Sequence, residues 1–147
     1  MGVVEQESKD ENSGVKSEVA AVGGSGRGSS ADDETQKLLA LIRGCIEERK
    51  GRDIVVLDLT ELTPVTDYFV ICSGTSSMHT RAISEHIEVS CKKAGFRYFG
   101  IEGEQNAKWV LMDYGDIVVH IFVDETRWFY NLERLWGDAR RVDLESD

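Results

Sequence analysis

Apolar residues recur at helical spacing in three stretches of the chain. The stretches cover residues 33–50, 75–95 and 124–137, and each predicts a helix with one face turned toward a core. Their candidate N-caps are Ser30 or Asp32 for the first helix, Thr75, Ser76 or Ser77 for the second, and Asp124 for the third. In the last helix the positions expected to face inward are Phe129, Leu132 and either Leu135 or Trp136.

Shorter apolar runs between these helices predict strands. Residues 53–59, 68–74 and 96–103 read as three strands, and the second is so uniformly apolar that we expect it to be central and covered on both faces. Trp109–Met112 and Ile117–Phe122, separated by Asp-Tyr-Gly-Asp, read as a β-hairpin. The order αββαβββα predicts an α/β (α+β) fold, with helices packed on a single mixed sheet of about five strands.

The pattern also sets the domain boundaries. Residues 1–32 contain no Leu, Ile, Phe, Trp, Tyr or Cys, and their acidic, Gly-Ser-rich composition predicts a disordered extension. Residues 33–141 carry the apolar periodicity and predict one domain, which suits a chain of 147 residues. Residues 142–147 are expected to form a loose tail.

Charge and cysteine usage narrow the classes of function. A formal charge of −10 without a local basic stripe argues against direct nucleic-acid binding and suits a basic partner. Three scattered cysteines without a C-x-x-C motif predict reduced thiols, with neither a disulfide framework nor a zinc site. No apolar run is long enough to span a membrane, and the acidic N-terminus differs from both signal and transit peptides.

Two groups of polar residues are candidates for chemical sites. The segment "SGTSS", residues 73–77, can offer backbone N–H groups to an anion, but a helix cap explains it without a ligand. Asp113 and Asp116 flank a turn, a spacing that points the two carboxylates apart rather than toward a shared metal ion. His120 lies on a buried strand and reads as a core histidine. These patterns predict no catalytic residue, cofactor or metal.

The hairpin carries two aromatic residues in unusual places. Trp109 opens its first strand directly after a polar segment, and Tyr114 lies in the turn beside Gly115. Trp and Tyr are enriched in binding hot spots, so the two rings could form a protruding docking tip. The alternative is that both rings cover the edge of the core, and spacing alone leaves the two readings open.

The text around these residues resembles the ribosomal silencing factor, or Iojap, family. The resemblance runs over about residues 35–140 and includes "TDYFVICSGTSSMHTRAISEHIE", "AGFRYFGIEGEQNAKWVLMDYGDIVVHIF" and "ETRWFYNLERLWGDA". It implies a nucleotidyltransferase-like fold without that fold's paired carboxylates, and hence a binding protein rather than an enzyme. The implied partner is the fourteenth protein of the universal large-subunit series, at the subunit interface, where binding blocks subunit joining and represses translation under nutrient limitation.

The same resemblance implies which residues touch the partner. They are Trp109, Asp113, Tyr114, Gly115, Lys108 and Glu102. We expect the rings of Trp109 and Tyr114 to face outward, and the protein to act in the bacterial cytoplasm rather than in an organelle. Two alternatives stay open: a degenerate nucleotidyltransferase using Ser76, Asp113 and Asp116, and a scaffold that self-associates when free.

Overall fold

A computed structural model describes residues 29–142. The domain is built on one mixed sheet. The strand order is β3-β4-β5-β2-β1-β6, with β2 and β5 parallel and every other neighbouring pair antiparallel. The strands are β1 Arg52–Asp58, β2 Tyr68–Gly74, β3 Gly100–Glu102, β4 Trp109–Asp113, β5 Ile117–Val123 and β6 Arg140–Val142. The predicted fold class is thus confirmed, with six strands where about five were expected.

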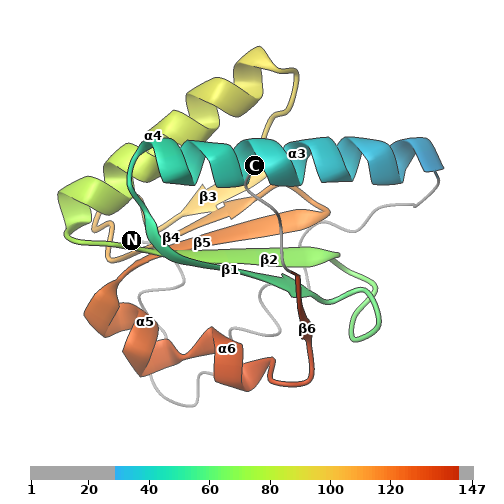
Figure 1. The fold of residues 1–147 in the computed structure, drawn as a ribbon. Coiled ribbons are helices and arrows are strands. Elements are labelled where there is room, and N and C mark those ends of the chain that lie inside the picture. The colour runs from blue at the N-terminus through green and yellow to red at the C-terminus, as the bar shows by residue number, and fades with distance from the viewer. Residues whose placement is uncertain (1–28, 143–147) are drawn as a thin grey trace.

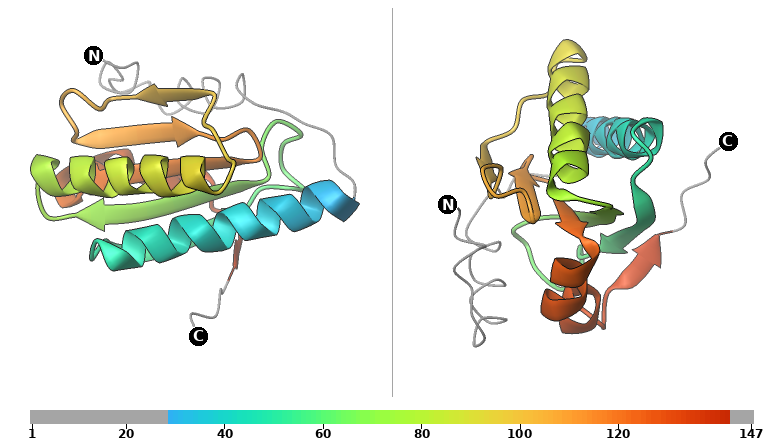
Figure 2. Two further views of the ribbon diagram at one scale, coloured as in Figure 1. Left: turned by 90° about the horizontal axis from the view of Figure 1, so that it is seen from above. Right: turned by 90° about the vertical axis from the view of Figure 1, so that its left-hand side faces the viewer.

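Helices cover both faces of this sheet (Figure 1). The long helices α3, Ser29–Glu48, and α4, Ser77–Lys93, lie side by side over one face (Figure 2). The short helices α5, Asp124–Tyr130, and α6, Leu132–Leu135, lie on the other face. Within the described residues, no helix is both long and apolar enough to cross a membrane.

Alternation along β2 divides the core into two layers. Val70 and Cys72 face the α3 and α4 layer, whereas Phe69 and Ile71 face the α5 and α6 layer. All four side chains are fully buried. A strand covered on both faces has no solvent-facing positions, which explains the continuous apolar run and confirms that β2 is central.

Several predicted element ends are wrong. Helix α3 begins at Ser29, so the proposed caps Ser30 and Asp32 lie inside its first turn, and the boundary drawn at residue 32 crosses a helix. Asp124 is the first residue of α5 rather than its cap, and its carboxylate pairs with Arg52 at 2.6 Å. The rest of the proposed N-terminal extension, residues 1–28, lies outside the described residues, as does the tail from residue 143.

The predicted last helix is interrupted at Asn131. This residue takes a left-handed conformation, with φ 45° and ψ 61°, which ends α5, and its side chain accepts a hydrogen bond from the Arg134 N–H to begin α6. The break changes which face points inward. Leu132 and Trp136 are buried as expected, but Phe129 is 67% exposed, so its predicted core position is wrong.

The two edge strands also differ from the prediction. Only residues 100–102 of the predicted strand 96–103 pair with β4, because Phe96 still closes the end of α4 through its N–H bond to the Cys91 carbonyl, at 2.8 Å. At the other edge, β6 pairs with β1, and its last residue, Val142, lies in the stretch expected to be a loose tail. Arg140 secures this pairing through an ion pair with Asp58 at 2.7 Å.

Candidate functional site

The turn between β4 and β5 is built by backbone and carboxylate hydrogen bonds. Gly115 has φ +88°, a conformation that glycine adopts at little cost, and its N–H donates to Asp113 Oδ1 at 2.8 Å. The Tyr114 N–H donates to the Ile117 carbonyl, also at 2.8 Å. The Asp-Tyr-Gly-Asp segment therefore forms the predicted hairpin turn, and Asp113 serves as its internal cap.

Trp109 does not project from the hairpin. Its side chain is 1% exposed, and its ring lies 4.7 Å from the rings of both Phe122 and Tyr130, centroid to centroid. The indole N–H donates to His120 Nδ1 at 3.1 Å. The expectation that this ring faces outward is wrong, because α5 brings Tyr130 across the start of β4 and closes the layer over the indole.

Tyr114 is buried as well, on the opposite face. It is 6% exposed, and its ring meets that of Tyr98 edge to face at a centroid distance of 6.2 Å. Burial raises the pKa of its phenol, with Cys91 and Glu88 nearby adding to the effect. The outward orientation predicted for this ring is also wrong, and the two aromatic residues cover the edges of two different core layers.

The two carboxylates of the turn point to different parts of the molecule. Asp113 is buried, and burial raises the pKa of its carboxyl, although the Gly115 N–H opposes the shift. Asp116 instead accepts a hydrogen bond from the Thr35 hydroxyl of α3 at 3.0 Å. Their divergence, predicted from the spacing, is confirmed.

Ser76 lies far from both carboxylates. Its hydroxyl accepts the His79 N–H at 3.1 Å and caps α4, as predicted for this segment. In the parallel pairing of β2 with β5, Gly74 is opposite Val123 and Tyr68 is opposite Ile117, so Ser76 and the turn lie at opposite ends of β2. Six residues of strand correspond to roughly 20 Å. The set proposed for a nucleotidyltransferase is not brought together.

His120 is the core histidine that the sequence favoured. It is fully buried between Trp109 and Phe69, whose ring centroid lies 4.4 Å from that of the imidazole. Burial lowers the pKa of His120 to about 3, so the ring is neutral at physiological pH. Because Nδ1 accepts the indole N–H, the proton of the neutral ring belongs on Nε2.

The exposed aromatic ring beside the hairpin belongs to Phe99, which the sequence reading missed. Phe99 is 76% exposed, and its N–H donates to the Asp113 carbonyl at 2.7 Å. A methyl group built on Gly115 would come within 2.9 Å of Phe99 Cε2, so the ring rests directly on the turn. The available signal was the excess of aromatic residues in "FRYFG", since Phe96 and Tyr98 already supply the core there.

The remaining predicted contacts lie along the same sheet edge. Glu102 is half-buried at the end of β3, opposite Leu111, and Lys108 is exposed just before β4. Behind Phe99, a groove of about 260 Å³ runs between α4 and the turn. Its lining residues are Glu88, Lys92, Phe96, Arg97, Tyr98 and Tyr114. We call Phe99, Glu102 and Lys108 the hairpin edge.

A second exposed aromatic surface lies on α5. Trp128 is 86% exposed beside Phe129 and borders an open groove of about 910 Å³. The charged residues that line this groove are Asp53, Asp124, Glu125, Arg127, Glu133 and Arg141. The surface fits the self-association that the sequence left open, which stays a prediction.

Comparison with known proteins decides which family has this architecture. Residues 32–147 match the model of the family described as "Ribosomal silencing factor during starvation". The chain belongs to the RsfS family of ribosomal silencing factors. A relative named "Ribosomal silencing factor RsfS", from Halalkalibacterium halodurans, is 38% identical over 110 residues, which are 75% of this chain and 94% of the relative.

Two further RsfS-like proteins extend the comparison. A Mus musculus protein named "Mitochondrial assembly of ribosomal large subunit protein 1" is 37% identical over 102 residues, covering 67% of this chain and 43% of that protein. The crystal structure of a Chromobacterium violaceum protein superposes with a TM-score of 0.68 at 35% identity, over 69% of this chain and 85% of the other. The family resemblance predicted from the hairpin and the β2–α4 segment is thus confirmed, and so is its association with translation.

Proposed function

We propose that this protein binds the large ribosomal subunit through a basic ribosomal protein at the subunit interface and blocks joining of the small subunit. The partner that best fits is the fourteenth protein of the universal large-subunit series. The observation that carries the proposal is the RsfS-family match over residues 32–147. The name of the mouse relative, which refers to large-subunit assembly, points to the same subunit.

Charge supports a basic partner. Residues 33–147 carry 21 Asp and Glu against 14 Lys and Arg, a net charge of −7. Opposite net charges speed the encounter of two proteins, while a few desolvated side chains supply most of the affinity.

The hairpin edge supplies the direct contacts in this proposal. Phe99 presents an exposed aromatic ring, with Glu102 at the end of β3 and Lys108 just before β4. The other four residues inferred from the family act behind it. Trp109 and Tyr114 hold the two core layers, and Asp113 and Gly115 fix the turn on which the Phe99 ring rests.

The mechanism is steric and needs no turnover. A domain of about 100 residues has a radius of gyration near 13 Å, so it occupies roughly 26 Å of the interface. An obstacle of that size prevents close apposition of the two subunits. We place this action in the bacterial cytoplasm, since the Halalkalibacterium relative named as a ribosomal silencing factor is a bacterial protein.

Two exposed phenylalanines provide a matched test. Phe99→Ala should weaken co-sedimentation with large subunits by about 30-fold, the equivalent of 2 kcal/mol for a hot-spot residue. Phe129→Ala removes an exposed ring of the same size from α5 and should bind normally. Both variants should keep the wild-type melting temperature, because neither ring is buried.

Subunit joining on sucrose gradients then tests the function itself. Added wild-type protein should shift ribosomes toward free subunits in proportion to its binding, and Phe99→Ala should need a correspondingly higher concentration. Normal binding by Phe99→Ala with loss in Phe129→Ala would move the interface to α5. Stoichiometric binding that leaves joining unchanged would refute the steric mechanism.

A further inference from the structure

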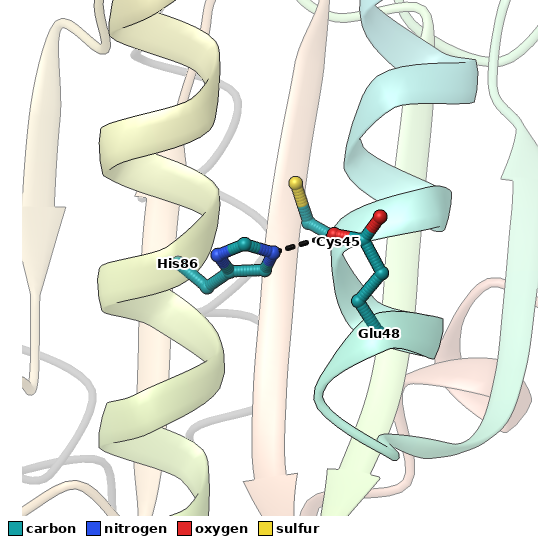
Figure 3. A group of neighbouring side chains, drawn as sticks. All are labelled: Cys45, Glu48 and His86. Carbon is teal, nitrogen blue, oxygen red and sulfur yellow. Dashed lines mark hydrogen bonds and ion pairs between the residues drawn. The ribbon is translucent and has the colours of Figure 1, made fainter.

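Helices α3 and α4 bring three metal-ligand side chains together where they cross. Cys45 and Glu48 are three residues apart and lie on one face of α3, and His86 reaches toward them from α4 (Figure 3). The thiol sulfur, a carboxylate oxygen and an imidazole nitrogen all lie within 4.8 Å of one another. Within residues 29–142 this is the one group of three that meets that condition.

The three donors match the preferences of one ion. Zn²⁺ takes sulfur, nitrogen and oxygen ligands at about 2.0–2.3 Å in a tetrahedron, which separates neighbouring ligand atoms by about 3.3–3.6 Å. His86 Nε2 and Glu48 Oε1 now lie 2.6 Å apart in a direct hydrogen bond. Opening that contact by less than 1 Å, through rotation of the long Glu48 side chain, gives the nitrogen-to-oxygen spacing that the ion requires. The Cys45 sulfur lies within 4.8 Å of both atoms.

We propose that Cys45, Glu48 and His86 bind a Zn²⁺ ion between α3 and α4, with a water molecule as fourth ligand. The site has one buried side and one open side. Cys45 is buried in the core, while the side chains of His86 and Glu48 are 18% and 65% exposed, so water and the ion reach the site from the surface. Three protein ligands and a water form the shell of an open zinc site.

The charges of the ligand set balance that of the ion. A thiolate and a carboxylate together carry two negative charges, which neutralise Zn²⁺ in a half-buried place where an unbalanced charge is costly. On binding, the Cys45 thiol loses its proton to solvent, and His86 binds through Nε2 as the neutral imidazole whose one proton lies on Nδ1. The step is a ligand exchange without change of oxidation state.

The surroundings can support the ligands. Ser90, one helical turn after His86 on α4, hydrogen-bonds to the Cys45 sulfur. Such outer contacts orient a ligand and change metal affinity by about 10–100-fold. The ion would link two helices that are now joined there by the Glu48–His86 hydrogen bond and by the contact of Ser90 with Cys45, so its binding should stabilise the packing of α3 on α4.

The competing interpretation is an ion pair lying over an unrelated core thiol. It predicts that the Glu48–His86 contact has no role in metal binding and that added zinc does not change the stability of the protein. The sequence predicts no zinc site because it has no closely spaced cysteines. The ligands proposed here come from two helices, and Glu48 and His86 are 38 positions apart in the chain.

The test uses the untagged full-length protein, stripped of metal by a chelator and titrated with Zn²⁺ by calorimetry and by thermal unfolding. We expect uptake of one ion per chain, a rise in melting temperature and no response to Mg²⁺, a hard ion that prefers oxygen ligands. Co²⁺ in place of Zn²⁺ should give a sulfur-to-metal charge-transfer band that Cys45→Ala abolishes.

Surface variants keep the test independent of folding. Glu48→Gln changes an exposed side chain and His86→Gln a half-buried one at the surface, and each should weaken Zn²⁺ binding by roughly tenfold or more. Glu47→Gln and Glu85→Gln, on the neighbouring positions of α3 and α4, should bind Zn²⁺ as the wild type does. Failure to take up Zn²⁺, or uptake that survives both Glu48→Gln and His86→Gln unchanged, would overturn the proposal.

Discussion

Acidification should destabilise this protein through His120. The imidazole is fully buried, its Nδ1 accepts the Trp109 indole N–H, and its Nε2 has no hydrogen-bond partner among the described residues. Protonation would place a second N–H on Nδ1, directly facing the indole donor. Burial alone, without a charged neighbour, lowers the pKa of His120 to about 3.

The sign and size follow from linkage. In the unfolded chain a histidine has a pKa of about 6.5, so between pH 6.5 and 3 the unfolded state binds a proton that the folded state refuses. The neutral His120 therefore contributes its full share to the free energy of unfolding above pH 6.5. That contribution is lost as the pH falls from 6.5 toward 3. From pH 7.5 to pH 5 the loss is about 2 kcal/mol, and any folded pKa below about 4 gives nearly the same figure.

Urea unfolding of the wild type and His120→Gln between pH 7.5 and 5 measures this term. The variant keeps a polar group that can accept the indole N–H but cannot titrate, so its stability should fall less than that of the wild type by about 2 kcal/mol. The raised pKa of Asp113 acts in the opposite direction, but it is common to both proteins. Carboxylates with ordinary pKa values titrate mostly below this range.

Parallel pH profiles for the two proteins would refute the reasoning. A second measurement does not depend on the variant: in the folded wild type, the His120 ring signals in an NMR titration should not move between pH 7.5 and 5. A titration midpoint near 6.5 for this ring would show that burial does not hold the imidazole neutral.

Substitutions at three positions test other parts of the fold by urea unfolding. Trp109→Ala should cost about 3–5 kcal/mol, since it empties a buried site and leaves His120 Nδ1 without its donor. Gly103→Ala should lower the free energy of unfolding by at least about 1 kcal/mol, because φ is +80° and the new methyl would lie 2.1 Å from the Trp109 carbonyl oxygen. Asn131→Ala should cost about 1–2 kcal/mol through loss of the α6 cap and left-handed strain, whereas Asn131→Gly should recover part of that cost.

Periodicity predicted the architecture because both core layers leave a repeating signal. The apolar run of β2 requires two covered faces, and the stripes of α3 and α4 require a sheet beneath them. The missed elements carry no such signal. Strand β6 has one half-buried residue, Val142, and is held by Arg140 pairing with Asp58, a contact between positions 82 residues apart.

The site was harder to predict, because the alternation of residues along a strand shows which face a side chain is on but not what covers that face. Strand alternation puts Trp109 and Tyr114 on opposite faces, but it cannot show that α5 folds back to place Tyr130 on the indole. That placement depends on the end of β5 and on the break at Asn131. Phe99 is exposed because Phe96 and Tyr98 already fill the core layer beside it.

The arrangement of the hairpin decides which substitutions can report on binding. Trp109 and Tyr114 are part of the core, so changing either alters folding and binding together, and a lost interaction would not identify a contact. Phe99 lies on the same turn but contributes little to the core. Its removal leaves both layers and the Asp113–Gly115 hydrogen bond intact. A binding defect in Phe99→Ala with unchanged stability would therefore assign a contact to the hairpin edge, which no substitution of the two buried rings can do.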